Sequence, residues 1–221
     1  MPSVNHDERT ISFKIVYCGT PLSGKTTNLQ CIHTRLDPTG RGDLVALSTA
    51  RDRTLFFDFL AVDAPVVPGY KTSFLLYTVP GQIVYNATLQ LVLQQADGVV
   101  FVADSQLDRQ RDNLQALQNL EANLRLNGSS IDRIPLVLQY NKRDLPGAAP
   151  VEYMEFLLNQ RSRRCLSFES DARSGRNVLA TLNAISMAVL QQFQQALTPL
   201  HEAPPTTTSE VPDEEAALAA T

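Results

Sequence analysis

The sequence predicts an α/β fold in which helices cover both faces of a mostly parallel sheet. Segments typical of strands alternate with segments typical of helices, which is the order found in parallel α/β proteins. The runs 98–103 and 135–140 are continuously apolar, as expected for parallel strands buried on both faces. The 221 residues are 43% hydrophobic and 19% charged, enough for one large core. Ligand chemistry is therefore expected at the carboxyl ends of the strands.

The elements are expected in the order βα, ββ and then αβαβαβα. The β-branched and aromatic run 11–18 predicts the first strand, and a glycine-rich turn leads from it into a helix over 26–36. The runs 54–62 and 70–79 are separated by turn residues and predict an antiparallel hairpin. The sheet should thus have six strands, one of them antiparallel. The later strands are predicted over 98–103, 135–140 and 165–169, and the later helices over 109–127, 151–160 and 178–197.

Acidic residues are concentrated at the end of the chain. The formal net charge is −4, but residues 198–221 hold five acids and no lysine or arginine, so the remainder is close to neutral. This composition, with four prolines, predicts a disordered acidic tail over 198–221 after a single domain over 1–197. A nearly neutral domain lacks the clustered positive charge that nucleic-acid binding requires, so no nucleic-acid partner is expected.

The sequence shows no pattern of export or membrane attachment. No apolar stretch approaches the roughly 18 residues of a spanning helix. The start lacks the basic and apolar regions of a signal peptide, and the end lacks a prenylation box. Three cysteines have neither disulfide-like nor zinc-like spacing. We therefore expect a cytoplasmic protein without an intrinsic membrane anchor.

The segment 19–26 fits the phosphate-binding motif G-x-x-x-x-G-K-[ST] and lies between the first predicted strand and the first predicted helix. In such a loop, backbone N–H groups and the helix N-terminus surround the phosphates. We expect Lys25 to contact the β- and γ-phosphate oxygens and the Thr26 hydroxyl to ligate Mg²⁺. The candidate phosphate-binding residues are Gly19, Thr20, Pro21, Leu22, Ser23, Gly24, Lys25, Thr26 and Thr27.

A second motif follows the predicted strand 135–140 and so belongs to the same edge of the sheet. The segment 141–144 resembles the N-K-x-D guanine motif of Ras-like GTPases. In that resemblance Asp144 accepts hydrogen bonds from guanine N1–H and the 2-amino group, Asn141 reaches N7, and Lys142 lies along the ring. Adenine lacks both donors, and a carboxylate left unpaired would cost about 1–3 kcal/mol. After the last predicted strand, Asp171 and Ala172 belong to a segment that resembles the loop whose backbone contacts guanine O6.

Together the motifs resemble one family. T-L-F-F-D-F (54–59), T-V-P-G-Q (78–82), V-F-V-A-D-S-Q (100–106) and Q-Y-N-K-R-D-L-P (139–146) are similar to the bacterial mutual gliding protein A (MglA) family of small Ras-like GTPases, over roughly 13–190. The resemblance implies the Ras-like P-loop GTPase fold, GTP/GDP and Mg²⁺ as cofactors, and a molecular switch in cell polarity and in gliding or type IV pilus motility. It also implies slow GTP hydrolysis without an activating protein.

The resemblance assigns catalytic roles to Lys25 and to residues of two further segments. Gly81 would sense the γ-phosphate through its N–H, and Gln82 would orient the attacking water. Arg53 would be an internally supplied arginine finger, with Thr54 beside it as a ligand of Mg²⁺ or the γ-phosphate. Thr78, a further candidate nucleotide-binding residue, stands where Ras-like proteins usually have Asp. The implied partners are a Roadblock-type homodimeric GTPase-activating protein (MglB-like) and polarity or motility effectors, which would bring the protein to a cell pole.

Three features leave alternatives open. Asp58 lies inside an apolar run, where it either holds a Mg²⁺-bound water in compensation for Thr78 or is an exposed residue of an edge strand. Pro21 removes one backbone donor from the loop, which puts efficient hydrolysis in doubt and allows a GTP-binding scaffold with little hydrolysis. A P-loop kinase or ATPase is the third interpretation, against which Asn141 and Asp144 argue.

Overall fold

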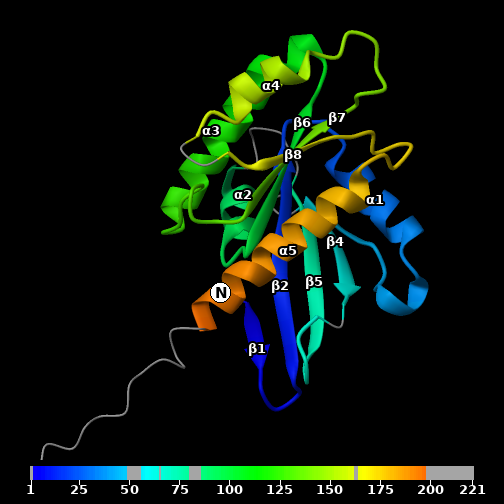
Figure 1. Ribbon diagram of the computed structural model, residues 1–221, viewed down its shortest axis with the longest axis vertical. Helices are drawn as coiled ribbons and strands as arrows, with labels where there is room; N and C mark the ends of the chain where they lie inside the picture. The colour runs from blue at the N-terminus through cyan, green and yellow to red at the C-terminus, as the bar shows by residue number, and fades with distance from the viewer. Residues whose placement is uncertain (1, 49–55, 65, 80–85, 162–163, 198–221) are drawn as a thin grey trace, which may run out of the picture.

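The computed structural model of the chain describes residues 2–48, 56–64, 66–79, 86–161 and 164–197. The described part contains an eight-stranded sheet in the order β3-β4-β5-β2-β6-β7-β8, with β1 paired to β2. Five α-helices lie against its faces (Figure 1). The predicted fold class is thus confirmed, with helices on both faces of a mostly parallel sheet. The predicted tail, residues 198–221, lies outside the described residues.

The strands and helices have the following bounds. The strands are β1 (Ser3–Asn5), β2 (Thr10–Gly19), β3 (Val45–Ser48), β4 (Phe56–Asp63), β5 (Lys71–Thr78), β6 (Gly98–Asp104), β7 (Leu136–Asn141) and β8 (Leu166–Glu169). The helices are α1 (Lys25–Arg35), α2 (Asn86–Leu93), α3 (Gln110–Leu126), α4 (Val151–Leu158) and α5 (Val178–Leu197), with short 3₁₀ turns at Pro38–Gly40 and Leu107–Arg109.

The sheet has two strands more than the six predicted. β1 is a three-residue exposed strand that pairs antiparallel with β2, and β3 pairs antiparallel with β4. Both are short, with three and four residues, so neither is long enough for a periodic pattern to identify it as a strand. The predicted hairpin is confirmed, because β4 pairs antiparallel with β5. β5, β2, β6, β7 and β8 all run parallel.

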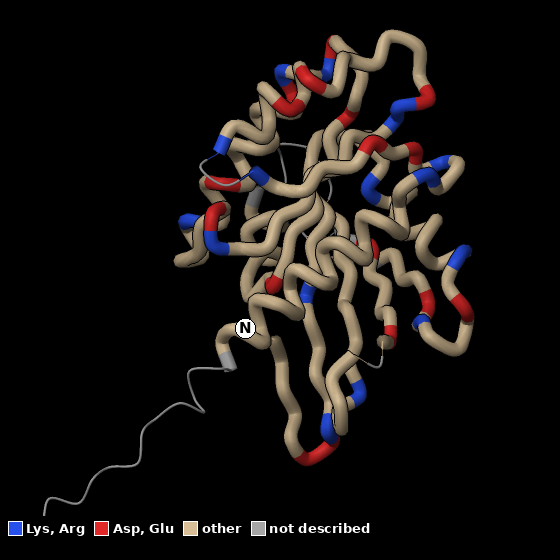
Figure 2. Tube along the Cα trace, in the orientation of Figure 1, with Lys and Arg blue, Asp and Glu red and all other residues tan. Residues whose placement is uncertain are grey.

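The central strand β2 separates two apolar cores. Its side chains alternate between the faces, as in any strand, and both faces are buried. Phe13 and Ile15 pack with α1 and α5 on one face, whereas Val16 and Cys18 pack with α2, α3 and α4 on the other. α5 has no charged residue along its length (Figure 2), so it relies on apolar packing for its position.

This arrangement brings distant segments to one edge of the sheet. β2 ends at Gly19, β6 at Asp104, β7 at Asn141 and β8 at Glu169, and Asp104 pairs directly with Asn141. The phosphate motif and the guanine motif therefore follow strands that are separated only by β6. None of the described helices is long and apolar enough to cross a bilayer.

The close packing of α5 on β6 should make the free energy of unfolding sensitive to a larger side chain at Gly98. A Cβ added at Gly98 would lie 2.6 Å from Cγ2 of Val189, too close without a shift of the helix. We expect Gly98→Ala to lower the free energy of unfolding by about 1–3 kcal/mol, measured by urea denaturation.

Gly42→Ala is the matched control, because its Cβ would lie 3.6 Å from the Ala61 Cβ, an ordinary contact. That control should stay within about 0.5 kcal/mol of the unchanged protein. Equal stability of the two variants would contradict the close packing of α5 on β6.

Candidate nucleotide-binding site

The phosphate loop connects the end of β2 to the start of α1. Gly19 and Gly24 both have left-handed backbones, with φ 138° and 97°. Glycine is also needed for space, since a Cβ at Gly19 would collide with the Val102 carbonyl and one at Gly24 with the Asn141 side-chain amide. Leu22, at the tip, has φ 62° although it is not glycine, and its side chain is 86% exposed. Gly19 and Gly24 therefore meet conformational and steric requirements that a residue with a side chain would not meet.

Lys25 folds back over the loop that precedes it. Its Nζ donates to the carbonyl oxygens of Thr20 (2.6 Å) and Gly19 (3.2 Å). Burial, and secondarily the positive charge of Lys142, lowers the pKa of Lys25 to about 8. Lys25 is therefore a buried ammonium whose partners are two carbonyls and which a phosphate oxygen would stabilise further.

A cavity of about 230 Å³ lies beside the loop, at the ends of β7 and β8. Three segments that are far apart in the sequence form its walls: the phosphate loop with the start of α1, the N-K-R-D segment, and the segment after β8. Asp144 is exposed at this cavity, whereas Asp171 and Ala172 are buried. The lining residues are Leu22, Gly24, Thr27, Asn141, Lys142, Asp144, Leu145, Asp171, Ala172 and Arg173.

Asn141 holds the three walls together. Its Nδ2 donates to the carbonyl oxygen of Ser23 (2.7 Å). Its Oδ1 accepts from the backbone N–H of Ala172 (2.9 Å) and from the Ser170 hydroxyl (3.1 Å). Because an amide nitrogen carries two hydrogens, one N–H of Asn141 has capacity for a further acceptor.

Lys142 is oriented by a buried carboxylate at the end of β6. Its Nζ lies 2.6 Å from Oδ2 of Asp104, whose side chain is 1% exposed. Gln106 donates to the same carboxylate through its backbone and side-chain N–H groups. Lys142 has φ 66°, so its backbone turns sharply where β7 ends. Asp104 was not predicted as a site residue, although it lies within the V-F-V-A-D-S-Q motif.

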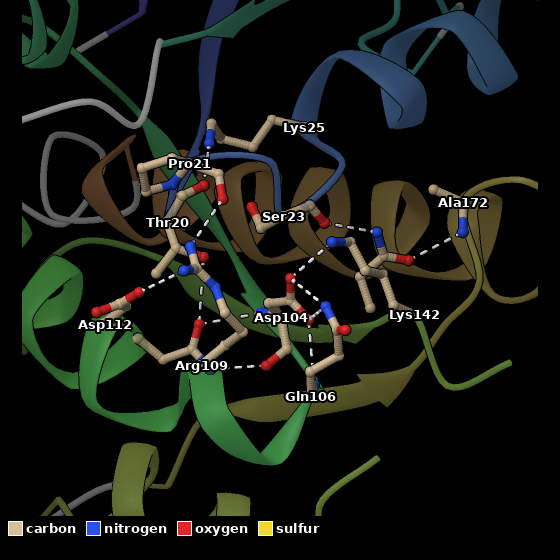
Figure 3. Close-up of polar contacts among 12 residues, drawn as sticks. Thr20, Pro21, Ser23, Lys25, Asp104, Gln106, Arg109, Asp112, Lys142 and Ala172 are labelled. Carbon is tan, nitrogen blue, oxygen red and sulfur yellow. Dashed lines mark hydrogen bonds and ion pairs between the residues drawn. The ribbon is translucent and has the colours of Figure 1, made fainter. Parts of the chain in front are cut away.

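The start of α3 contacts the phosphate loop from the other side. Asn113 is buried and accepts from the Thr20 hydroxyl (3.3 Å) and from the backbone N–H of Asp104 (3.0 Å). Figure 3 shows the Arg109 guanidinium group between Asp112, at 2.7 Å, and the carbonyl oxygen of Pro21, at 3.4 Å. Neither Arg109 nor Asn113 was predicted as a site residue, because a polar residue in or beside an amphipathic helix is normally assigned to the solvent face.

Thr26 faces β4 and β5 rather than the cavity. Its hydroxyl donates to Oδ2 of Asp58 (2.6 Å), which also accepts from the Thr78 hydroxyl (2.8 Å). The edge-strand interpretation of Asp58 is wrong, because β3 pairs with β4 and places it inside the sheet. Thr78, where Ras-like proteins usually have Asp, hydrogen-bonds to a carboxylate on the neighbouring strand.

Four predicted catalytic or ligating residues lie outside the described residues: Arg53, Thr54, Gly81 and Gln82. Among the residues the structure does describe, no cluster of three or more His, Cys, Asp or Glu side chains is arranged to hold a metal ion. Thr26, Asp58 and Thr78 instead offer two hydroxyls and one carboxylate.

Comparison with known proteins identifies the family. No family model matches the chain. The chain is 47% identical over 195 residues to the mutual gliding-motility protein MglA of Myxococcus xanthus (strain DK1622), and the alignment covers 88% of this chain and 99% of that protein. As its motifs predicted, the chain belongs to the MglA family of small Ras-like GTPases.

Proposed function

We propose that this protein is a GTP/GDP switch of cell polarity and motility, whose guanine nucleotide lies along the carboxyl edge of the sheet. One observation carries the proposal: the phosphate loop, the N-K-R-D segment and the segment after β8 line a single cavity of about 230 Å³. A nucleotide with its phosphates in the loop and its base in the cavity would contact all three segments. The 47% identity to MglA supports the assignment to motility.

The base would be selected by Asp144. Its carboxylate is exposed at the cavity, where it can accept from the N1–H and 2-amino groups of guanine. Asn141 supports this pocket by fixing its walls and has one N–H left for N7. Asp171 and Ala172 would supply backbone contacts to O6 if their N–H groups, which donate to the Arg176 carbonyl oxygen and to Asn141 Oδ1, exchange these acceptors for the base. An adenine base would leave the Asp144 carboxylate without donors.

The phosphates would be held by the loop amides, Lys25 and a Mg²⁺ ion. Mg²⁺ prefers hard oxygen ligands, and the Thr26 hydroxyl and Asp58 carboxylate lie within 2.6 Å of each other on adjacent elements. These residues fit the ion if Thr26 ligates it directly and Asp58 does so through water, with Thr54 as a further ligand. When bound, Mg²⁺ neutralises charge on the β- and γ-phosphate oxygens.

Hydrolysis would depend on residues of the two switch segments. We infer that Gln82 orients the attacking water, that Gly81 contacts the γ-phosphate, and that Arg53 stabilises the transition state. A guanidinium placed there accelerates phosphoryl transfer by about 10³–10⁵. A Roadblock-type homodimeric activating protein and polarity or motility effectors would read the GTP-bound state.

Selectivity for guanine over adenine should depend on Asp144. Asp144→Asn replaces one of the two acceptor oxygens with an NH₂ donor and removes the negative charge, so at most one of the two guanine donors keeps an acceptor, and each lost hydrogen bond to a charged group is worth about 1.5–3 kcal/mol. We expect GDP affinity to fall at least tenfold while ADP affinity changes little, as measured by displacement of a fluorescent nucleotide. Glu152→Gln is the control, because it makes the same change from carboxylate to carboxamide at an exposed position on α4. Unchanged preference for GDP over ADP in Asp144→Asn would refute the proposal.

The second prediction concerns pH. The pKa of Lys25 is about 8 without nucleotide, and phosphate oxygens beside it would raise this pKa. Binding at pH 8 should therefore take up about half a proton per GDP, and affinity should fall as pH rises above 8, whereas uptake should be near zero below pH 7.

Calorimetry of nucleotide-free protein in buffers of different ionisation enthalpy measures this uptake. Asp144→Asn, titrated at higher protein concentration, is the control, because it weakens binding without changing the lysine. Binding at pH 8 with no proton uptake would show that Lys25 does not contact the phosphates.

The third prediction separates the switch from a scaffold without hydrolysis. Pro21 lacks an N–H and places a ring in the phosphate loop, so Pro21→Gly should raise the single-turnover rate of GTP hydrolysis severalfold. Arg53→Ala in the same background should lower the rate again, by about 10³ or more. Background hydrolysis in both the natural protein and Pro21→Gly, with GTP bound, would favour the scaffold.

A further inference from the structure

A second cavity, of about 430 Å³, lies at the opposite edge of the sheet from the candidate nucleotide site. It opens where β7 and β8 begin, and the last turns of α5 form one of its walls. Apolar side chains contribute part of the lining, including Leu166, which is 63% exposed. No role in nucleotide binding involves this edge of the sheet.

The cavity is positively charged. Arg133, Arg161 and Arg164 line it, against the single acid Asp132 among the described lining residues. Within the part of the chain that the structure describes, none of the three arginines has a carboxylate within ion-pair distance, although Arg164 interacts with Glu155 at longer range. The Nη1 atom of Arg161 is buried and has no hydrogen-bond partner among the described residues. A buried guanidinium nitrogen without an acceptor is unfavourable, so the site favours an anionic occupant.

The acidic tail is the anionic segment nearest to this cavity in the sequence. α5 ends at Leu197, and Gln191, Gln192 and Gln195 of α5 line the cavity, so the tail begins beside it. The chain has no lysine or arginine after Arg176, whereas residues 198–221 contain Glu202, Glu210, Asp213, Glu214 and Glu215.

The tail is also long enough to reach the arginines. An extended chain spans about 3.3–3.6 Å per residue, so Asp213 can lie as far as about 50 Å from Leu197. A tether of this kind gives an effective concentration in the millimolar range, so even weak pairing would populate the docked state.

We propose that the acidic segment 210–215 docks into this cavity of its own chain. Its carboxylates would pair with Arg133, Arg161 and Arg164, since guanidinium groups accept carboxylates in a bidentate geometry. Val211 and the alanines that follow Glu215 would cover the exposed Leu166. Docking would shield this face of α5 and β8 from other acidic partners, and it is independent of the nucleotide site.

The test compares full-length GDP-bound proteins by NMR. Asp213→Asn, Glu214→Gln and Glu215→Gln are combined, which removes three charges with little change of shape. Backbone amide resonances of 131–137 and 164–166 should shift by more than a linewidth, while those of the phosphate loop stay in place. In the unchanged protein, about 1 M NaCl, where the Debye length is about 3 Å, should move the same resonances toward their positions in the triple variant.

The matched control removes three exposed acids elsewhere, as Asp7→Asn, Glu8→Gln and Asp43→Asn. It should leave the cavity resonances unchanged. Arg133→Gln combined with Arg164→Gln, both exposed, should sharpen the tail resonances to those of an unbound chain. Identical cavity resonances in the unchanged protein and the triple tail variant would overturn the proposal. Shifts that grow with protein concentration would also overturn it, because the tail would then bind a second copy.

Discussion

The candidate site depends on the side-chain amide of Asn141 more than on any other group. This buried amide bonds to the phosphate loop through the Ser23 carbonyl and to the segment after β8 through Ser170 and Ala172. Its own strand supplies the N-K-R-D segment, so one residue sets the relative positions of three walls. Gly24 leaves the room for it, since a Cβ there would collide with the amide. A shorter or charged side chain would leave several buried polar groups unpaired.

A second polar network connects the phosphate loop to the N-K-R-D segment through the ends of β6 and α3. Asp104 holds Lys142, and the backbone of Asp104 is held by Asn113, which in turn accepts from the Thr20 hydroxyl. Each buried polar atom in this path has a partner, which is the condition under which such networks add rigidity instead of cost. The loop for the phosphates and the loop for the base are thus coupled through the ends of β6 and α3, so a change at either end of the network should affect the other.

The pairing of Asp58 with Thr26 and Thr78 shows how one departure from the Ras-like pattern is accommodated. The usual carboxylate at position 78 is replaced by a hydroxyl, and a carboxylate on the neighbouring strand lies 2.8 Å from it. The negative charge therefore stays near Thr26 but comes from β4. This requires β4 to lie beside β5 and to be covered by β3, so the extra strand at the edge has a direct effect on the site.

The sequence by itself determined the fold class, the order of the helices and of six of the eight strands, and the two nucleotide motifs, because each depends on local patterns: apolar periodicity, glycine positions and short spacings. It predicted the ends of α5 and the start of α4 to the residue. Only the tertiary structure decided which groups meet across the sheet. Arg109 and Asn113 reach the site from the start of α3, where polar residues have no distinctive local pattern, and the role of Asp104 depends on Lys142, which is distant in the chain. The tertiary structure also decided that Asp58 lies inside the sheet, because the order of strands depends on contacts between segments that are distant in the chain.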